Sequence, residues 1–175
     1  MTKGSVRFLD TNILLRYLLR DDEEKARRAL GLLNLVEQGR EKVAISAMVI
    51  FEVIFTLQRR HQVPRQQIRD SVKDILSFRG LELPSKRLYE RALDLYAARP
   101  NLSFPDAFHA VYMHAQGIEE IYSWDTDFDK LEGIRRVEPI LTAADLRDVA
   151  EQAIAEEAVE RMGEESDRGE EYDQS

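Results

Sequence analysis

The chain has 175 residues and no cysteine, which allows one domain with a substantial core and excludes disulfides and thiolate metal sites. Its formal net charge of −8 lies in residues 151–175, which hold 10 acidic and 2 basic residues, whereas residues 1–150 hold 23 of each. Positive charge therefore does not by itself indicate nucleic-acid binding. No apolar run approaches the roughly 20 residues of a membrane span, so we expect a cytoplasmic protein without membrane contact.

Short apolar stretches alternate with segments of helical apolar spacing. This alternation predicts an α/β fold in which a short, mainly parallel sheet is flanked by helices. The strand at 6–9 is apolar enough to be buried. We expect strands at 6–9, 43–45, 81–83, 118–123 and 137–140, and helices within 11–19, 22–39, 46–61, 64–79, 85–100 and 103–117.

Helix-start residues precede several of these segments. Ser46 and Ser85 are predicted N-caps, and Pro64 suits a first helical position. Ser103 followed three residues later by Asp106 is typical of a capping box in which aspartate takes the role of glutamate. In the helix after Ser46, we expect four apolar side chains to face the core: Val49, Val53, Phe55 and Leu57.

The end of the chain differs from the rest in composition. Residues 142–162 show amphipathic helical spacing, and residues 163–175 are too polar to pack in a core. We therefore expect a domain over 1–141 and an acidic C-terminal extension over 142–175, helical at first and then disordered.

Four acidic residues are candidates for a functional site. Asp10 ends the first strand, Asp106 begins a helix, Asp125 follows a strand, and Glu52 interrupts an apolar helix. In parallel α/β sheets, side chains at the carboxyl ends of the strands reach the crevice where ligands bind. Three of them also have a structural interpretation, since Asp10 and Asp106 suit helix caps and Glu52 could pair with an arginine.

Carboxylates are suitable ligands for Mg²⁺ or Mn²⁺, which prefer oxygen. Two such ions about 4 Å apart can activate water and stabilise the leaving oxygen of a phosphodiester. The four acids therefore indicate metal-dependent phosphodiester chemistry, provided that they meet in the fold.

Four segments, in this order and at these separations, resemble the PIN-domain nucleases, most of all the VapC-type ribonuclease toxins: FLDTNILLRYL, FEVIF, SFPDAFHA and YSWDTDFDKL. The resemblance extends from about residue 5 to residue 141. It implies an endoribonuclease with a Mg²⁺ or Mn²⁺ cofactor. The matching acidic positions are Asp10, Glu52, Asp106, Asp125 and the additional Asp127, and the supporting polar positions are Thr11, Asn12 and Ser123.

Other sites are excluded by the pattern. The series beginning at Asp125 is similar to a calcium-binding loop, but Lys130 and Arg136 stand where glycine and glutamate are needed. Asn12 stands where a haloacid-dehalogenase-type phosphatase needs its second aspartate. His109 and His114 are five residues apart, so they do not share the helix face that a zinc site requires.

The resemblance also implies partners. An RNA substrate and a protein antitoxin are expected, and a homodimer is compatible with the sequence. Arg16 and Arg20 lie four apart on the first helix, near Asp10, and are candidate contacts for RNA phosphates or for an acidic partner, although solvated surface arginines are the simpler interpretation. A PIN-like module that binds RNA or protein without cleavage is the alternative function.

Overall fold

The computed structural model describes residues 6–139, 142–144, 146–147, 150–152 and 154–155. The described residues of 1–121 and 125–136 form one compact unit, and those of 122–124 and 137–175 form a second. The domain boundary after residue 141 stays a prediction. In the part of the chain that the structure describes, no helix combines the length and the apolar character needed to cross a membrane.

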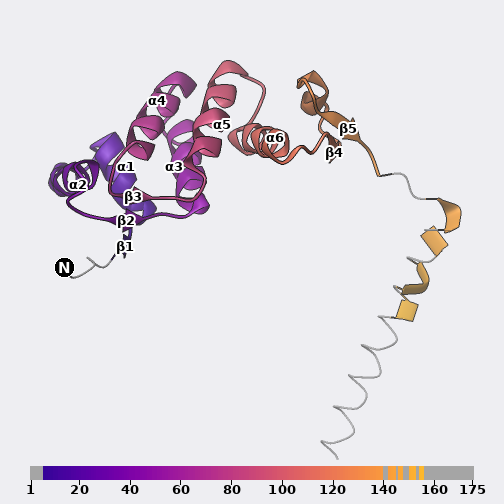
Figure 1. Cartoon of the computed structure of the whole chain (residues 1–175), viewed down its shortest axis with the longest axis horizontal. Helices are drawn as coiled ribbons and strands as arrows, with labels where there is room; N and C mark the ends of the chain where they lie inside the picture. The colour runs from indigo at the N-terminus through magenta and orange to yellow at the C-terminus, as the bar shows by residue number, and fades with distance from the viewer. Residues whose placement is uncertain (1–5, 140–141, 145, 148–149, 153, 156–175) are drawn as a thin grey trace, which may run out of the picture. The chain divides into compact units, whose positions relative to one another are not determined.

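The first unit contains a small parallel sheet, as the sequence predicted. Its strands are in the order β1-β2-β3 (Figure 1), and Arg7 lies opposite Val43, which lies opposite Leu81. The bounds are β1 (Arg7–Phe8), β2 (Val43–Ala44) and β3 (Leu81–Glu82).

Six helices connect and follow these strands, close to the predicted ranges. They are α1 (Thr11–Leu19), α2 (Glu23–Glu37), α3 (Ala47–Arg59), α4 (Arg65–Leu76), α5 (Lys86–Ala98) and α6 (Phe104–Gln116). The chain continues through β4 (Glu120–Tyr122), the 3₁₀ helix η1 (Thr126–Lys130) and β5 (Arg135–Val137).

Strands β4 and β5 form a separate two-stranded sheet. The last strand was predicted at 137–140, but it begins earlier, because the Arg135 amide donates to the Glu119 carbonyl at 2.7 Å. Residues 138 and 139 lie outside the strand, and residue 140 lies outside the described residues.

The prediction of a buried first strand is wrong. Phe8 is 66% exposed, and Val6 and Arg7 are exposed as well, whereas Leu9 is buried. Among the described strands, β1 pairs only with β2, so it is an edge strand. The apolar composition of the segment does not distinguish an edge strand from a central one, because both need a side chain such as Leu9 facing the core.

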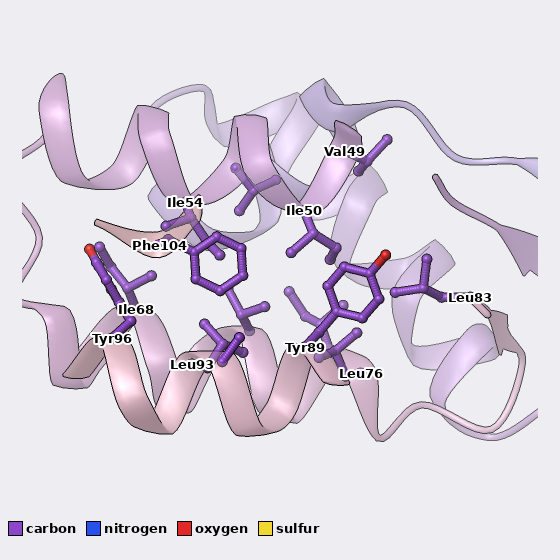
Figure 2. Packing of buried hydrophobic residues seen from close by; sticks show 14 of the residues in the cluster. Val49, Ile50, Ile54, Ile68, Leu76, Leu83, Tyr89, Leu93, Tyr96 and Phe104 are labelled. Carbon is purple, nitrogen blue, oxygen red and sulfur yellow. The ribbon is translucent and has the colours of Figure 1, made fainter. Parts of the chain in front are cut away.

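The core lies mainly among α3, α4, α5 and α6. Side chains from α3 and α5 point toward each other in Figure 2, and the Phe104 ring of α6 lies between them. The expected α3 residues Val49, Val53 and Leu57 are buried, but Phe55 is 59% exposed. At about 100° per residue, Phe55 points roughly 200° away from both Val53 and Leu57. The prediction for Phe55 is therefore wrong.

The three predicted serine N-caps all occupy N-cap positions, but only one of them makes a capping hydrogen bond. Ser103 caps α6, accepting a hydrogen bond from the Asp106 amide at 3.3 Å. Ser46 and Ser85 occupy the N-cap positions of α3 and α5, but neither side chain makes a capping bond. Pro64 is itself the N-cap of α4 rather than its first helical residue.

Gly80, directly before β3, packs closely against the end of α2. Its amide donates to the Val36 carbonyl at 2.8 Å, and a Cβ there would lie 2.0 Å from the Glu41 carbonyl oxygen. Only glycine permits this approach of two backbone segments.

Within the range of the predicted C-terminal helix, residues 143–144, 146–147, 150–152 and 154–155 are helical. Leu146 and Ile154, two apolar residues of this segment, are exposed. The predicted disorder of the last residues concerns a segment outside the described residues.

Candidate active site

Asp10 connects the sheet to the first helix. The Leu9 amide pairs with the Ala44 carbonyl of β2 at 2.9 Å, which holds the chain in the sheet up to this point. Asp10 is then the N-cap of α1, and its carboxylate accepts a hydrogen bond from the Asn12 amide at 3.1 Å. The side chain is exposed, so a cap function leaves carboxylate oxygen accessible to a ligand.

Thr11 links this strand end to α3. Its side chain is buried, at 4% exposure, and its hydroxyl donates to the Glu52 Oε2 atom at 2.8 Å. Glu52 itself is exposed, and it is absent from the ion pairs formed among the described residues. The expected burial cost of a charge in an apolar helix is therefore avoided, because Glu52 lies on the outer side of α3 and has a hydroxyl partner.

Asp106 is held at the start of α6. The Ser103 hydroxyl donates to the Asp106 carboxylate as well as accepting from its amide. Phe104 is buried against Phe51 of α3, with ring centroids 5.0 Å apart, and Phe51 is the neighbour of Glu52. This aromatic contact fixes the first turn of α6 against the helix that carries Glu52.

Asp125 begins η1 as its N-cap, accepting a hydrogen bond from the Asp127 amide at 2.9 Å. Asp127 pairs with Lys130, whose Nζ atom lies 2.5 Å from its carboxylate. This hydrogen bond and the negative charge of Asp127 raise the pKa of Lys130. Asp127 and Lys130 also line a cavity of about 300 Å³ together with the α5–α6 connection, residues 98–102.

The two candidate arginines have different environments. Arg16 pairs with Asp21 at 2.5 Å, and this hydrogen bond raises the pKa of the guanidinium and lowers the pKa of the carboxyl group. Arg20 ends α1 in the left-handed conformation, with φ of 55°. Ser123 lies in the second unit, where its amide donates to the Val137 carbonyl at 3.1 Å.

Arg16 also lines a groove between α1 and α2, with a cavity volume of about 600 Å³. Every charged side chain in its wall is basic, and Asn12 at one end is two residues from Asp10. Sequence reasoning missed Lys25 and Arg28, although their three-residue spacing on an amphipathic helix was a signal. The lining residues are Asn12, Ile13, Arg16, Lys25, Arg28, Ala29 and Leu32.

The structure thus connects Asp10 with Glu52 through Thr11, and the α3 helix with Asp106 through Phe51 and Phe104. Within the described ranges, no three acidic or histidine side chains are grouped closely enough to hold one metal ion. The joint metal site therefore stays a prediction.

Comparison with known proteins identifies the fold family. The family model for the PIN domain matches residues 7–134, a span that contains Asp10, Glu52, Asp106 and Asp125. The chain belongs to the PIN domain family. The α/β architecture predicted from the sequence is therefore the PIN fold.

Proteins similar to this PIN domain carry the name VapC. The VapC ribonuclease of Aquifex aeolicus (strain VF5) is 29% identical over 134 residues, a match that covers 77% of this chain and 97% of the relative. Among solved structures, VapC20 of Mycobacterium tuberculosis, described as a sarcin-ricin loop cleaving toxin, is 25% identical. This match covers 77% of this chain and all of that chain, with a TM-score of 0.29.

Proposed function

We propose that this PIN-domain protein is an endoribonuclease that hydrolyses RNA phosphodiester bonds with a carboxylate-bound Mg²⁺ or Mn²⁺, and that it is the toxin of a toxin–antitoxin pair. The observation that carries this proposal is its similarity to a VapC ribonuclease over 97% of the length of that protein. It is further supported by the carboxylate side chains at all four candidate positions, Asp10, Glu52, Asp106 and Asp125.

The side chains suit a hard divalent ion. Asp10, Glu52, Asp106 and Asp125, with Asp127, would hold it through carboxylate oxygens, some of them through water, since Mg²⁺ usually takes only one or two carboxylates directly. When bound, a divalent ion supplies Lewis-acid activation of water and stabilises charge on the leaving oxygen. The exposure of Asp10, Glu52 and Asp125 makes their carboxylates accessible to a polymeric substrate.

Neighbouring hydroxyl groups would orient two of these carboxylates. Thr11 donates to Glu52, and Ser103 donates to Asp106. A carboxylate held by a charge-assisted hydrogen bond loses rotational freedom, which favours one geometry for binding an ion or a phosphate.

The groove between α1 and α2 supports the proposed binding partners. Arg16, Lys25 and Arg28 in its wall pair with Asp21, Asp22 and Glu24, and they would exchange these exposed ion pairs for RNA phosphates, with Arg20 a further candidate. The same wall suits an acidic segment of a protein antitoxin, and a homodimer is a further proposed assembly. Competition between RNA and an antitoxin would follow from their use of one surface.

Cleavage assays test the proposal. Purified protein should cleave structured RNA with Mg²⁺ or Mn²⁺ and should lose this activity in excess EDTA. The Asp10→Asn variant, purified in the same way, is the control for contaminating nuclease, because it lacks one of the proposed metal ligands. Equal cleavage in EDTA, or equal cleavage by the variant, would contradict the proposed chemistry.

A PIN-like module that binds without cleavage is the second candidate. It is favoured by the absence, among the residues that the structure describes, of a group of three acids arranged for one metal ion. The two functions differ in one measurement. RNA binding that leaves the RNA intact under Mg²⁺ and under Mn²⁺ would assign the protein to this alternative.

A further inference from the structure

Arg65, at the start of α4, holds the connection between α5 and α6. Its Nη1 atom donates to three backbone carbonyls, those of Tyr96 at 3.0 Å, Arg99 at 3.1 Å and Leu102 at 2.6 Å. Its guanidinium carbon lies 4.3 Å from the centroid of the Tyr96 ring. A nitrogen with two hydrogens that serves three acceptors must share at least one hydrogen, so the three carbonyls are drawn to one point.

These contacts complete the end of α5. The last carbonyls of a helix have no partner within the helix, and a cation near them is favoured by the helix dipole. The side chain that supplies this cation comes from another helix, 31 to 37 residues earlier in the chain. Arg65 therefore determines where the chain lies as it leaves α5.

The held segment leads directly to Asp106. Leu102, which accepts the shortest of the three bonds, precedes Ser103, and Ser103 bonds both the amide and the carboxylate of Asp106. The following residue, Phe104, packs its ring against Tyr96, the residue beneath the Arg65 guanidinium, with centroids 5.9 Å apart. Arg65 thus bonds the residue directly before the α6 N-cap and stacks on a ring that packs against the first residue of α6.

The same segment shares a cavity with a second acidic residue. Residues 98–102 line the cavity that also contains Asp127 and Lys130. The connection clamped by Arg65 is therefore shared by the start of α6, with Asp106, and by the neighbourhood of η1, with Asp127. A shift of this connection would move Asp106 and would change the wall of the cavity that Asp127 lines.

We propose that Arg65 is a positioning residue for the metal-binding carboxylates, acting on Asp106 through Leu102 and Ser103. This inference rests on the proposed function. Its chemistry requires arginine, because the planar guanidinium combines carbonyl hydrogen bonds with stacking on Tyr96, whereas a lysine would keep the charge but lose the planar contact.

The competing interpretation is that Arg65 only fastens α4 to α5. Lys73 provides the matched control, since its ammonium group bonds both carboxylate oxygens of Asp94 at 2.9 Å and links the same two helices. Lys73 lies two turns further along α4, away from the α5–α6 connection. A purely structural role predicts that both variants lower the melting temperature and leave metal dependence unchanged.

The experiment compares Arg65→Met, Arg65→Lys and Lys73→Met in the full chain. For each variant, the Mg²⁺ concentration for half-maximal RNA cleavage and the rise in melting temperature on adding Mn²⁺ are measured. Loss of a residue that supports metal ligands typically weakens metal affinity by about 10-fold or more. Arg65→Met should therefore need about 10-fold more Mg²⁺, Arg65→Lys should lie between it and the parent, and Lys73→Met should match the parent.

A double variant tests the route. If Arg65 acts through Ser103, the effects of Arg65→Met and Ser103→Ala on the half-maximal Mg²⁺ concentration should be less than additive. If Arg65→Met does not fold, Arg65→Lys replaces it in this cycle, because it keeps the positive charge near the helix end.

The outcomes separate the two levels of inference. An Arg65 variant with a lowered melting temperature but with the metal dependence of the parent would reduce Arg65 to a link between helices and leave the ribonuclease proposal intact. A parent protein that neither cleaves RNA with Mg²⁺ nor gains stability with Mn²⁺ would overturn the proposed function, and the positioning role with it.

Discussion

Replacing Thr11 with valine should remove the link between α1 and Glu52 with little change in shape. The Thr11 hydroxyl is buried and donates to a carboxylate at 2.8 Å. A hydrogen bond to a charged group contributes about 1.5–3 kcal/mol. Because Glu52 is exposed, water can replace the hydroxyl at the carboxylate, and valine leaves no unpaired donor behind. We therefore expect the free energy of unfolding to fall by about 1 kcal/mol, below that range.

For a chain of this length, about 1 kcal/mol corresponds to a melting temperature lower by about 2–4 °C. The measurement is thermal unfolding followed by circular dichroism, with urea unfolding as an independent estimate of the free energy. Thr11→Ser is the matched control, because it keeps the hydroxyl and should recover most of the loss. The isosteric valine changes neither β-branching nor helix propensity substantially.

A double-mutant cycle with Glu52→Ala decides whether the hydrogen bond is the cause. If it is, Thr11→Val should cost much less in the Glu52→Ala background than in the parent, with a coupling energy of about 0.5–1 kcal/mol. Equal costs in the two backgrounds would refute the reasoning and would assign the effect of Thr11 to packing alone.

Three further predictions concern other parts of the PIN domain. Asp106→Asn should lower the free energy of unfolding by about 0.3–1 kcal/mol, because a negative charge is lost near the α6 N-terminus, and it should abolish RNA cleavage. A variant that is equally destabilised in EDTA and in Mg²⁺ but still cleaves RNA would restrict Asp106 to capping. Gly80→Ala should lower the free energy of unfolding in urea by about 3 kcal/mol or more, because its Cβ would meet a backbone carbonyl. Gly31→Ala has open space and should raise the free energy of unfolding by up to about 1 kcal/mol. Equal effects of the two substitutions would contradict the close approach at Gly80. The Arg16 hydrogen bond lowers the pKa of Asp21, so the pair stabilises the fold above the ordinary titration range of aspartate, and this stabilisation is lost as the pH falls through the lowered pKa. Arg16→Gln should raise the pKa of Asp21, which an NMR titration measures. An unchanged pKa would exclude the pairing in solution.

Local sequence patterns determined much of the fold. Helical spacing and start signals predicted α2 from Asp22, α4 after Pro64 and α6 after Ser103, because caps and apolar stripes depend on residues three or four positions apart. The positions of Asp10, Asp106 and Asp125 at strand ends or helix starts followed from the same local patterns.

Exposure depended on the tertiary structure. The apolar composition of residues 6–9 did not distinguish an edge strand from a central one, so the exposure of Phe8 was missed. Phe55 was assigned to the core from its composition, although the rotation of the helix places it opposite Val53 and Leu57. The missing capping bonds of Ser46 and Ser85 likewise depend on backbone geometry that residue type does not specify.

The sequence by itself determined which residues are acidic, where each lies on its own element and, for Asp106, the local capping partner, whereas only the tertiary structure decided which side chains distant in the sequence meet. Thr11 and Glu52 are 41 residues apart, and Arg65 is 37 residues from the Leu102 carbonyl. Such contacts depend on how helices pack against one another, and a periodicity read along one helix contains no information about the residue that arrives from another. Residue chemistry therefore identified the candidate acids, and helix packing decided that the Thr11 hydroxyl meets Glu52 and that the Arg65 guanidinium meets the α5–α6 connection.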